Sequence, residues 1–166
     1  NPSDMSSNRI NPIDRIRRAP EQEKAAVAEK LADLVIMNGE SSEGRGDQTW
    51  NRSEKLLLIP LLLHAAAGDP RRGHFGALRW LLAEGPDALT KVLKDSPSRI
   101  ARMEFQGWSR LAGETNFKYG VFSGLVTKLN PWMTDQMIAL TETTDIDLDA
   151  LASQLFTFYL AVPSRS

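Results

Sequence analysis

Apolar residues recur at helical spacing over residues 20–38. Val27, Leu31, Leu34 and Val35 fall at i, i+4, i+7 and i+8, and charged residues occupy the other side of the helical wheel. A stripe of this kind is typical of an amphipathic helix that covers a core. The spacing predicts a helix that begins at Pro20 and turns these apolar side chains inward.

A second run, residues 56–63, is apolar almost all round. It follows Trp50, and Asp47 is a suitable residue to cap the start of a helix. Pro60 removes one backbone hydrogen bond within the run and should bend the helix there. Because a helix without a polar face must be buried, the run predicts the central helix of the fold.

Shorter amphipathic helices follow, separated by glycine and proline. Gly85 is placed to close one helix and Pro86 to open the next. Ser96 is expected to cap the helix after that, whose inward stripe is Ile100, Met103, Trp108 and Leu111. The helix predicted next contains four residues small enough to let a neighbour approach closely: Gly120, Ser123, Gly124 and Thr127.

The two ends of the chain break the helical pattern. Residues 155–162 are an unbroken apolar run with aromatic and β-branched residues, stopped by Pro163, and they predict a β-strand of the kind covered on both faces. Residues 1–19 are polar, and Pro12 and Pro20 favour an extended conformation there. Since a lone strand has no partner here, we expect the chain to be part of a larger protein. The predicted fold is mainly α, a compact multi-helix bundle with extended termini and one C-terminal β-strand.

The net charge of the chain and its distribution limit the kinds of partner that the chain is expected to bind. The 166 residues carry 20 Lys and Arg against 21 Asp and Glu, a net charge of −1 that argues against a generic polyanion binder. The charge is uneven, however, because residues 71–110 hold eight basic and four acidic groups. The chain has no cysteine, so disulfides and thiolate metal sites are excluded, which suits a reducing compartment.

A basic ridge lies in this middle third. Arg99, Arg102 and Arg110 fall at i, i+3 and i+11, with Gln106 between them, opposite the apolar stripe of their helix. Such a ridge can contact phosphates or an acidic protein partner, and a solvated helix face is the alternative. The candidate partner- or DNA-binding residues are Arg71, Arg72, Lys91, Lys94, Arg99, Arg102, Gln106 and Arg110.

Motifs for catalysis or cofactor binding are incomplete. Residues 39–44 match the first half of a phosphate-binding loop, but Arg45 and Gly46 stand where Lys and Ser or Thr are needed. Asp145 and Asp147 alternate like the start of a calcium loop whose later glycine and glutamate are missing, so we expect one of them to cap a helix.

The two histidines, His64 and His74, lie in separate predicted helices without an acidic partner at ligand spacing. We expect both to be core or boundary residues rather than catalytic bases. The chain is therefore predicted to have no catalytic, cofactor-binding or metal-binding residue.

Three segments together carry a family resemblance. Residues 8–16 (NRINPIDRI), Trp50 at the head of the long apolar helix, and residues 155–163 (LFTFYLAVP) resemble the middle of the type IV secretion coupling proteins of the TraG/TraD kind. Members of that family are membrane-anchored, hexameric ATPases that pass DNA or protein substrates to a conjugation or secretion channel.

The resemblance implies three parts. Residues 1–19 would be an extended segment leading in from a parent nucleotide-binding domain, residues 20–153 an all-α domain, and residues 154–166 a strand returning to the parent. The Walker A and Walker B motifs would lie outside this chain, which is then no enzyme. ATP and Mg²⁺ would be cofactors of the parent alone.

The resemblance also implies a role for the all-α domain. It would receive substrates at the cytoplasmic mouth of the motor, at the inner face of the bacterial cell membrane. The partners would be the relaxosome, or effector and adaptor proteins, with DNA itself as a further candidate, while the isolated chain would be a soluble monomer. The alternatives are a helical domain that binds DNA directly and an unrelated helical scaffold or interaction domain.

Overall fold

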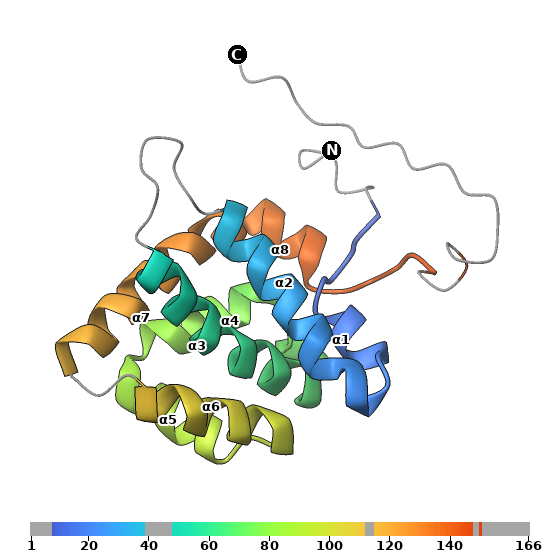
Figure 1. Ribbon diagram of the computed structural model, residues 1–166. Helices are drawn as coiled ribbons and strands as arrows, with labels where there is room; N and C mark the ends of the chain where they lie inside the picture. The colour runs from blue at the N-terminus through green and yellow to red at the C-terminus, as the bar shows by residue number, and fades with distance from the viewer. Residues whose placement is uncertain (1–7, 39–47, 112–114, 148–149, 151–166) are drawn as a thin grey trace.

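The chain folds into a bundle of helices, shown in a computed structural model that describes residues 8–38, 48–111, 115–147 and 150 (Figure 1). These residues contain no β-strand, which confirms the predicted mainly α class. No helix within these ranges is long and apolar enough to cross a membrane. The α-helices are α1 (Asp14–Arg18), α2 (Lys24–Asn38), α3 (Gln48–Ala67), α4 (Phe75–Ala83), α5 (Pro86–Lys94), α6 (Arg99–Leu111), α7 (Thr115–Leu129) and α8 (Asp135–Thr141), and the 3₁₀ turns are η1 (Glu21–Glu23), η2 (Pro70–Arg72) and η3 (Asn130–Met133).

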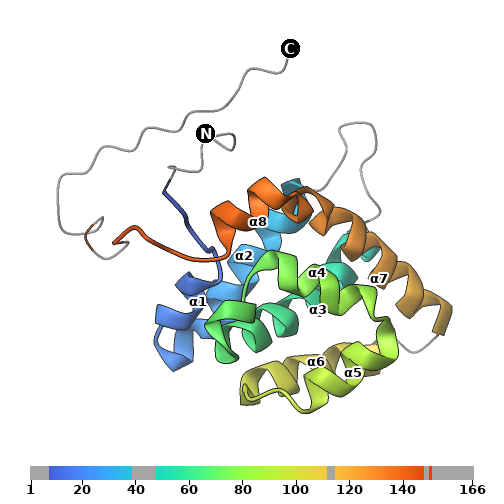
Figure 2. The same cartoon turned by 180° about the vertical axis from the view of Figure 1, so that it is seen from behind.

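Helix α3 is the centre of the bundle, as its apolar run predicts. It packs against α1, α2, α6 and α7. Both views show α3 in the middle, with α5 and α6 on one side and α2 and α8 on the other (Figures 1 and 2). All residues from Leu57 to Leu63 are buried, including Pro60 inside the helix. Burial on every side leaves no place for a polar residue in this run.

The inward face of α2 matches the prediction except at Leu34. Val35 is buried, and Val27 and Leu31 are partly buried against the core. Ala28 and Ala32 are buried as well, whereas Leu34 is 58% exposed. The two small alanines let α2 lie close to its neighbours, so the buried face is centred on them and the side chain of Leu34 stays outside.

Helix α6 shows the same kind of shift. Trp108 is buried and Ile100 packs against the core, as predicted, but Met103 is 59% exposed, and Ala101 and Phe105 are buried in its place. Phe105 and Trp108 stack with ring centroids 5.8 Å apart. The two aromatic rings fill the space against α3 and α5, which leaves Met103 on the outer side.

The cap of α6 is Ser98, not Ser96. The Ser98 hydroxyl accepts the backbone N–H of Ala101 at 3.1 Å, three residues on, as an N-cap does. Ser96 is buried instead, and its hydroxyl lies 2.9 Å from His64 Nδ1. Because α6 begins at Arg99, Ser96 is too far from the helix to cap it, and its hydroxyl contacts His64 and the Ser98 N–H instead.

Two of the four small residues predicted on α7, Gly120 and Gly124, let a neighbour approach closely, whereas Ser123 and Thr127 are exposed. A Cβ on Gly120 would lie 2.7 Å from the ring of Trp50, and one on Gly124 would lie 1.9 Å from Glu54 Oε1. Both partners are on α3. Glu54 is buried and pairs with the Lys128 ammonium of α7. The two glycines thus make room for an aromatic ring and for a buried ion pair.

The N-terminal segment is not extended throughout. Residues 14–18 form α1, and Ile13 and Ile16 are completely buried. A proline restricts its own backbone and that of the residue before it, and the residues between Pro12 and Pro20 are free to form a helix. Ile13 and Ile16 are spaced at i and i+3, so both lie on one face of a helical turn. Burial of these side chains therefore overrides the polar character of the surrounding residues.

The two described ends of the helical body run side by side. Ile10 N–H donates to the Leu140 carbonyl at 2.9 Å, and Asp145 N–H donates to the Arg9 carbonyl at 3.1 Å. We call this pairing of residues 8–11 with residues 140–145 the stem. The predicted C-terminal strand lies outside the described residues, and the assignment of the ends to a parent domain stays a prediction.

Candidate functional site

Four of the eight candidate partner- or DNA-binding residues surround one depression on the surface. The hollow has a volume of about 350 Å³ and lies between the end of α5 and the outer flank of α6. We call it the α5–α6 hollow. Its lining residues are Lys94, Arg102, Phe105, Gln106, Ser109 and Arg110.

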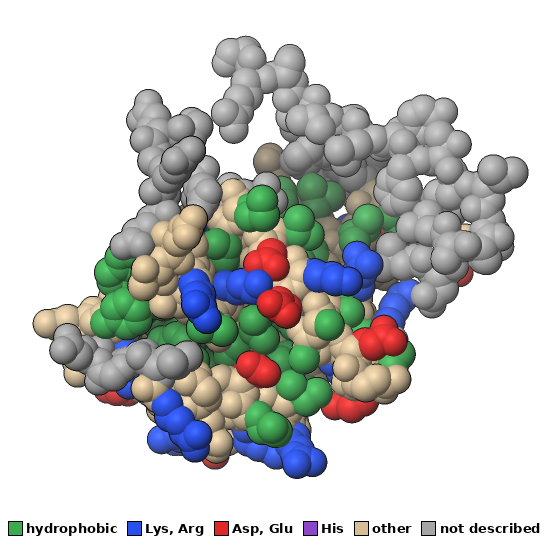
Figure 3. All heavy atoms as spheres, in the orientation of Figure 1, with side chains coloured by type: hydrophobic (Ala, Val, Ile, Leu, Met, Phe, Trp, Pro, Cys, Tyr) green, Lys and Arg blue, Asp and Glu red, His purple; other side chains and the backbone are tan. Residues whose placement is uncertain are grey.

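Every titratable side chain that lines the α5–α6 hollow is cationic. Lys94 and Arg110 are exposed and make no ion pair with the described residues. The acidic residue of α6, Glu104, follows Arg102 by two positions and therefore points about 200° away around the helix. Figure 3 shows Lys and Arg side chains gathered along the lower edge of the molecule, over α5 and α6. The hollow is thus an electropositive site.

The guanidinium of Arg102 is fixed in place. Its Nη1 donates to the carbonyl oxygen of Ser96, in the turn between α5 and α6. Ser96 is itself buried against His64 of α3. One cation of the hollow is therefore held by the core, while Lys94 and Arg110 extend from the rim.

The remaining predicted residues lie elsewhere. Lys91 and Arg99 are exposed but do not line the α5–α6 hollow. Arg71 and Arg72 stand on η2, beside a larger hollow of about 660 Å³ that α4 borders. We call this second depression the α4 hollow. The eight candidates therefore do not form one surface.

Charges cancel in the α4 hollow. Arg71 and Arg72 share its lining with Asp69 and Glu84. Asp69 also caps η2, because its carboxylate accepts the Arg71 backbone N–H at 3.0 Å. With two positive and two negative side chains, this hollow has no net preference for an anion.

An exposed tryptophan in the α4 hollow escaped the sequence reasoning. Trp80 is 60% exposed and lines the depression. The signal was present, since Trp80 lies off the stripe formed by the buried residues Phe75, Leu78 and Leu82 of the same helix. An aromatic residue outside an apolar stripe points away from the core.

Both histidines are structural, as expected. His74 is buried at the start of α4, where its Nδ1 accepts the Ala77 N–H at 3.4 Å. Burial lowers the pKa of the His64 and His74 imidazoles below the ordinary value, and for His74 the nearby Arg17 adds to the decrease while Glu142 opposes it. Neutral imidazoles therefore add no charge to the α4 hollow at neutral pH.

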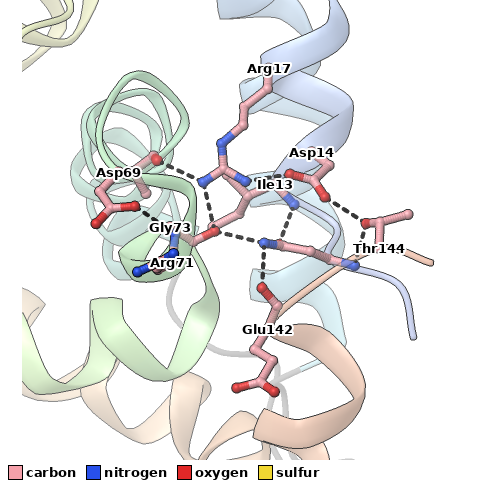
Figure 4. Close-up of polar contacts among 10 residues, drawn as sticks. Ile13, Asp14, Arg17, Asp69, Arg71, Gly73, Glu142 and Thr144 are labelled. Carbon is pink, nitrogen blue, oxygen red and sulfur yellow. Dashed lines mark hydrogen bonds and ion pairs between the residues drawn. The ribbon is translucent and has the colours of Figure 1, made fainter. Parts of the chain in front are cut away.

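A polar network anchors the stem to the body. Asn11 is buried, its side-chain amide donates to the Gly73 carbonyl at 2.8 Å, and its Oδ1 accepts the Ile13 N–H at 3.0 Å. Asn11 N–H donates to the Thr144 hydroxyl at 2.9 Å, which in turn donates to Asp14 at 2.6 Å. Figure 4 shows these groups converging from three parts of the chain.

Arg17 completes the network. It pairs with Asp14, and its Nη2 donates to the carbonyl oxygens of Ala65 and Gly73, each at 3.0 Å. Gly73 directly follows η2, so the turn that borders the α4 hollow also carries the anchor of the stem. We call Asn11, Asp14, Arg17 and Thr144 the stem network.

The two aspartates near the end of the described chain have separate tasks. Asp147 Oδ1 accepts the Ala150 N–H at 3.1 Å, the contact that an N-cap makes three residues on, and the helix that it was predicted to cap lies, after Ala150, outside the described residues. Asp145 instead accepts the Arg9 backbone N–H at 2.7 Å. Within the described ranges no three His, Asp or Glu side chains come together as metal ligands, and residues 39–47 with the partial phosphate loop lie outside them.

The comparison with protein families identifies the chain. The model for type IV secretory system conjugative DNA transfer matches residues 1–166, and the chain belongs to this family. It is a domain of the conjugation coupling-protein type and takes part in DNA transfer. No curated protein and no solved structure matches the chain.

Proposed function

We propose that this chain is the substrate-recognition domain of a type IV secretion coupling ATPase. It receives DNA–protein complexes or effector proteins, with or without adaptors, for transfer. The observation that carries the proposal is the stem, which pairs residues 8–11 with residues 140–145 and so attaches the whole helical body at one place. Helices α5 and α6, whose residues line the α5–α6 hollow, lie on the side of the body away from the stem (Figures 1 and 2).

In this proposal the rest of the coupling protein supplies the motor. The parent is a membrane-anchored hexamer at the inner face of the bacterial cell membrane, and it binds ATP and Mg²⁺ in its nucleotide-binding domain. The chain described here contributes no catalytic group and no cofactor ligand. Its task is to present a surface to the substrate before the motor acts.

Direct binding of DNA by this domain is the second candidate. The observation in its favour is the cationic lining of the α5–α6 hollow, since neutralisation of phosphates by Lys and Arg dominates nucleic-acid affinity. Against it stands the net charge of −1 for the whole chain.

Site-specific photo-crosslinking in the complete coupling protein tests the proposed function. A photoreactive residue replaces Lys91 or Arg99 on the α5–α6 side, or Lys30 on α2 as a control, and crosslinks are collected during transfer. We expect the transferred protein or its adaptor to be captured from the α5–α6 side. Transfer that proceeds without any capture of substrate by the helical body contradicts the proposal.

A further inference from the structure

The α5–α6 hollow has the chemistry to recognise carboxylates. We infer that it binds an acidic peptide segment of the protein that is handed over for transfer. This inference rests on the proposed function and adds the chemical class of the partner. It starts from the lining of the hollow, in which Lys94, Arg102 and Arg110 are the titratable groups and no carboxylate is present.

Preorganisation is the first argument for a binding site. The Ser96 carbonyl holds the Arg102 guanidinium, so little side-chain freedom is lost when Arg102 meets a carboxylate. Phe105, which also lines the hollow, is 2% exposed and is therefore held in place by the core. A solvated helix face would have neither a fixed cation nor a buried aromatic residue in its lining.

Unsatisfied charge is the second argument. Lys94 and Arg110 have no acidic partner among the described residues, although Asp and Glu are as abundant as Lys and Arg in the whole chain. Lys94 and Arg110, together with the fixed Arg102 in the same lining, match a peptide segment that carries several carboxylates. Gln106 and Ser109 add an amide and a hydroxyl that can hydrogen-bond to a peptide backbone.

The same geometry disfavours nucleic acid. Single strands are held by bases stacked on exposed aromatic rings, but Phe105 and Trp108 of α6 are both buried. A duplex is too wide to enter a hollow of about 350 Å³, so its phosphates cannot reach the cation that lies within the hollow. An extended peptide can enter such a hollow and place its carboxylates against all three cations.

Fluorescence anisotropy with the purified chain tests the inference. The probe is a labelled peptide that alternates glutamate and alanine, and its neutral counterpart alternates glutamine and alanine. We expect the acidic peptide to bind at physiological ionic strength and the neutral one not to bind. The double variant K94Q/R110Q should bind the acidic peptide about tenfold more weakly, because two charge-assisted contacts are lost. Both residues are exposed, so circular dichroism should show an unchanged fold.

A matched variant separates the hollow from overall charge. K30Q/R52Q also removes one exposed lysine and one exposed arginine, from α2 and α3. It should bind the acidic peptide within about twofold of the original chain, since exposed charges far from a ligand are screened by salt. Equal weakening by both double variants overturns the inference, as does an undiminished affinity of K94Q/R110Q or a failure of the original chain to bind the peptide.

Oligonucleotides provide the competing outcome. Single-stranded and duplex DNA are titrated under the same conditions, and tighter binding of either, lost in K94Q/R110Q, would make the hollow a nucleic-acid site and overturn the inference. The outcome is separable from that of the proposed function. If the substrate crosslinks to the α5–α6 side but the acidic peptide does not bind, only the inference that the partner is acidic is refuted. If the peptide binds but no substrate crosslinks during transfer, the proposed substrate-recognition function is refuted.

Discussion

The carboxylate of Asp145 accepts the backbone N–H of Arg9 at 2.7 Å, although 136 positions separate the two residues. The Arg9 Nε donates to the other carboxylate oxygen at 3.1 Å, and the Asp145 N–H returns a hydrogen bond to the Arg9 carbonyl. The Arg9 N–H holds the pKa of the Asp145 carboxyl below its usual range. Asp145 therefore joins the two segments of the stem through both its backbone and its side chain. These contacts hold the two described ends of the helical body next to each other.

Replacement of Asn11 by alanine should destabilise the fold. The Asn11 side chain is buried and satisfies the Ile13 N–H and the Gly73 carbonyl. Without it, the buried Ile13 N–H loses its partner, and such an unpaired group costs about 1–3 kcal/mol. Urea unfolding followed by circular dichroism should show a lower free energy of unfolding by about this amount.

Asn8 provides the comparison within the same segment. It is exposed, and its amide lies 3.5 Å from the Asp145 carboxylate, at the limit of a hydrogen bond. Asn8→Ala should therefore change the free energy of unfolding by less than about 0.5 kcal/mol. Equal effects of the two substitutions would show that the stem network contributes nothing specific to stability.

Gly124→Ala should also destabilise the chain. The new methyl group would lie 1.9 Å from Glu54 Oε1, in a place that the Glu54–Lys128 pair occupies. Because Glu54 is buried, its carboxylate cannot move aside without losing Lys128 or shifting α7 away from α3. We expect a loss of about 1–3 kcal/mol in the free energy of unfolding, the usual cost of overpacking.

Gly107→Ala is the matched control for this prediction. Gly107 lies on the exposed side of α6, and nothing lies within 4 Å of a Cβ placed there. Alanine loses less conformational entropy than glycine in a helix, so this substitution should stabilise the fold by about 0.5–1 kcal/mol. Opposite signs for the two substitutions in thermal melts are the expected outcome. A stabilising Gly124→Ala would contradict the close approach of α3 and α7.

The sequence predicted those features that depend on one helix alone. Leu57 to Leu63 have no polar residue among them, so their burial follows from composition. Gly124 lacks a side chain, so a close neighbour could be expected there without knowing which one. The exposure of Leu34 was not predictable in this way, because Leu34 and Val35 both belong to the predicted apolar stripe and only the packing of α2 against its neighbours leaves one of them outside.

The candidate site was half predictable for a similar reason. Spacing placed Arg102 and Arg110 on the outer flank of α6, where they are found. That Lys94 joins them while Lys91 does not depends on how α5 crosses α6, which no local pattern encodes. The stem network gave no signal at all, since Asn11 and Thr144 are 133 positions apart and both are common loop residues.

Stability should fall as the pH drops below the ordinary histidine pKa of 6.5. Burial lowers the folded-state pKa of His64 and His74, so the unfolded chain takes up protons first. Protonation then favours the unfolded state, and the stability contributed above pH 6.5 is lost as the pH falls through the folded-state values. Urea unfolding at a series of pH values should show a free energy of unfolding that decreases on the acid side.

Proton NMR can assign this loss to the two imidazoles. Both should titrate with midpoints below 6.5 in the folded chain. His64→Gln keeps a polar group near the Ser96 hydroxyl while removing one titration, and should flatten the pH dependence. A folded-state midpoint above 6.5 for either histidine would reverse the sign and refute the prediction.

The chain by itself should bind no nucleotide, although the proposed parent is an ATPase. Residues 39–44 share glycines with a phosphate loop, but Arg45 and Gly46 replace the lysine that reaches the phosphates and the hydroxyl that holds Mg²⁺. Glu40 and Glu43 would further repel the phosphates. Isothermal titration of ATP and Mg²⁺ into the chain should give only heats of dilution, equal to those from a titration of Mg²⁺ alone. A saturable heat with a micromolar dissociation constant would place a nucleotide site within this chain. It would contradict the proposal that ATP binds only to the nucleotide-binding domain of the parent protein.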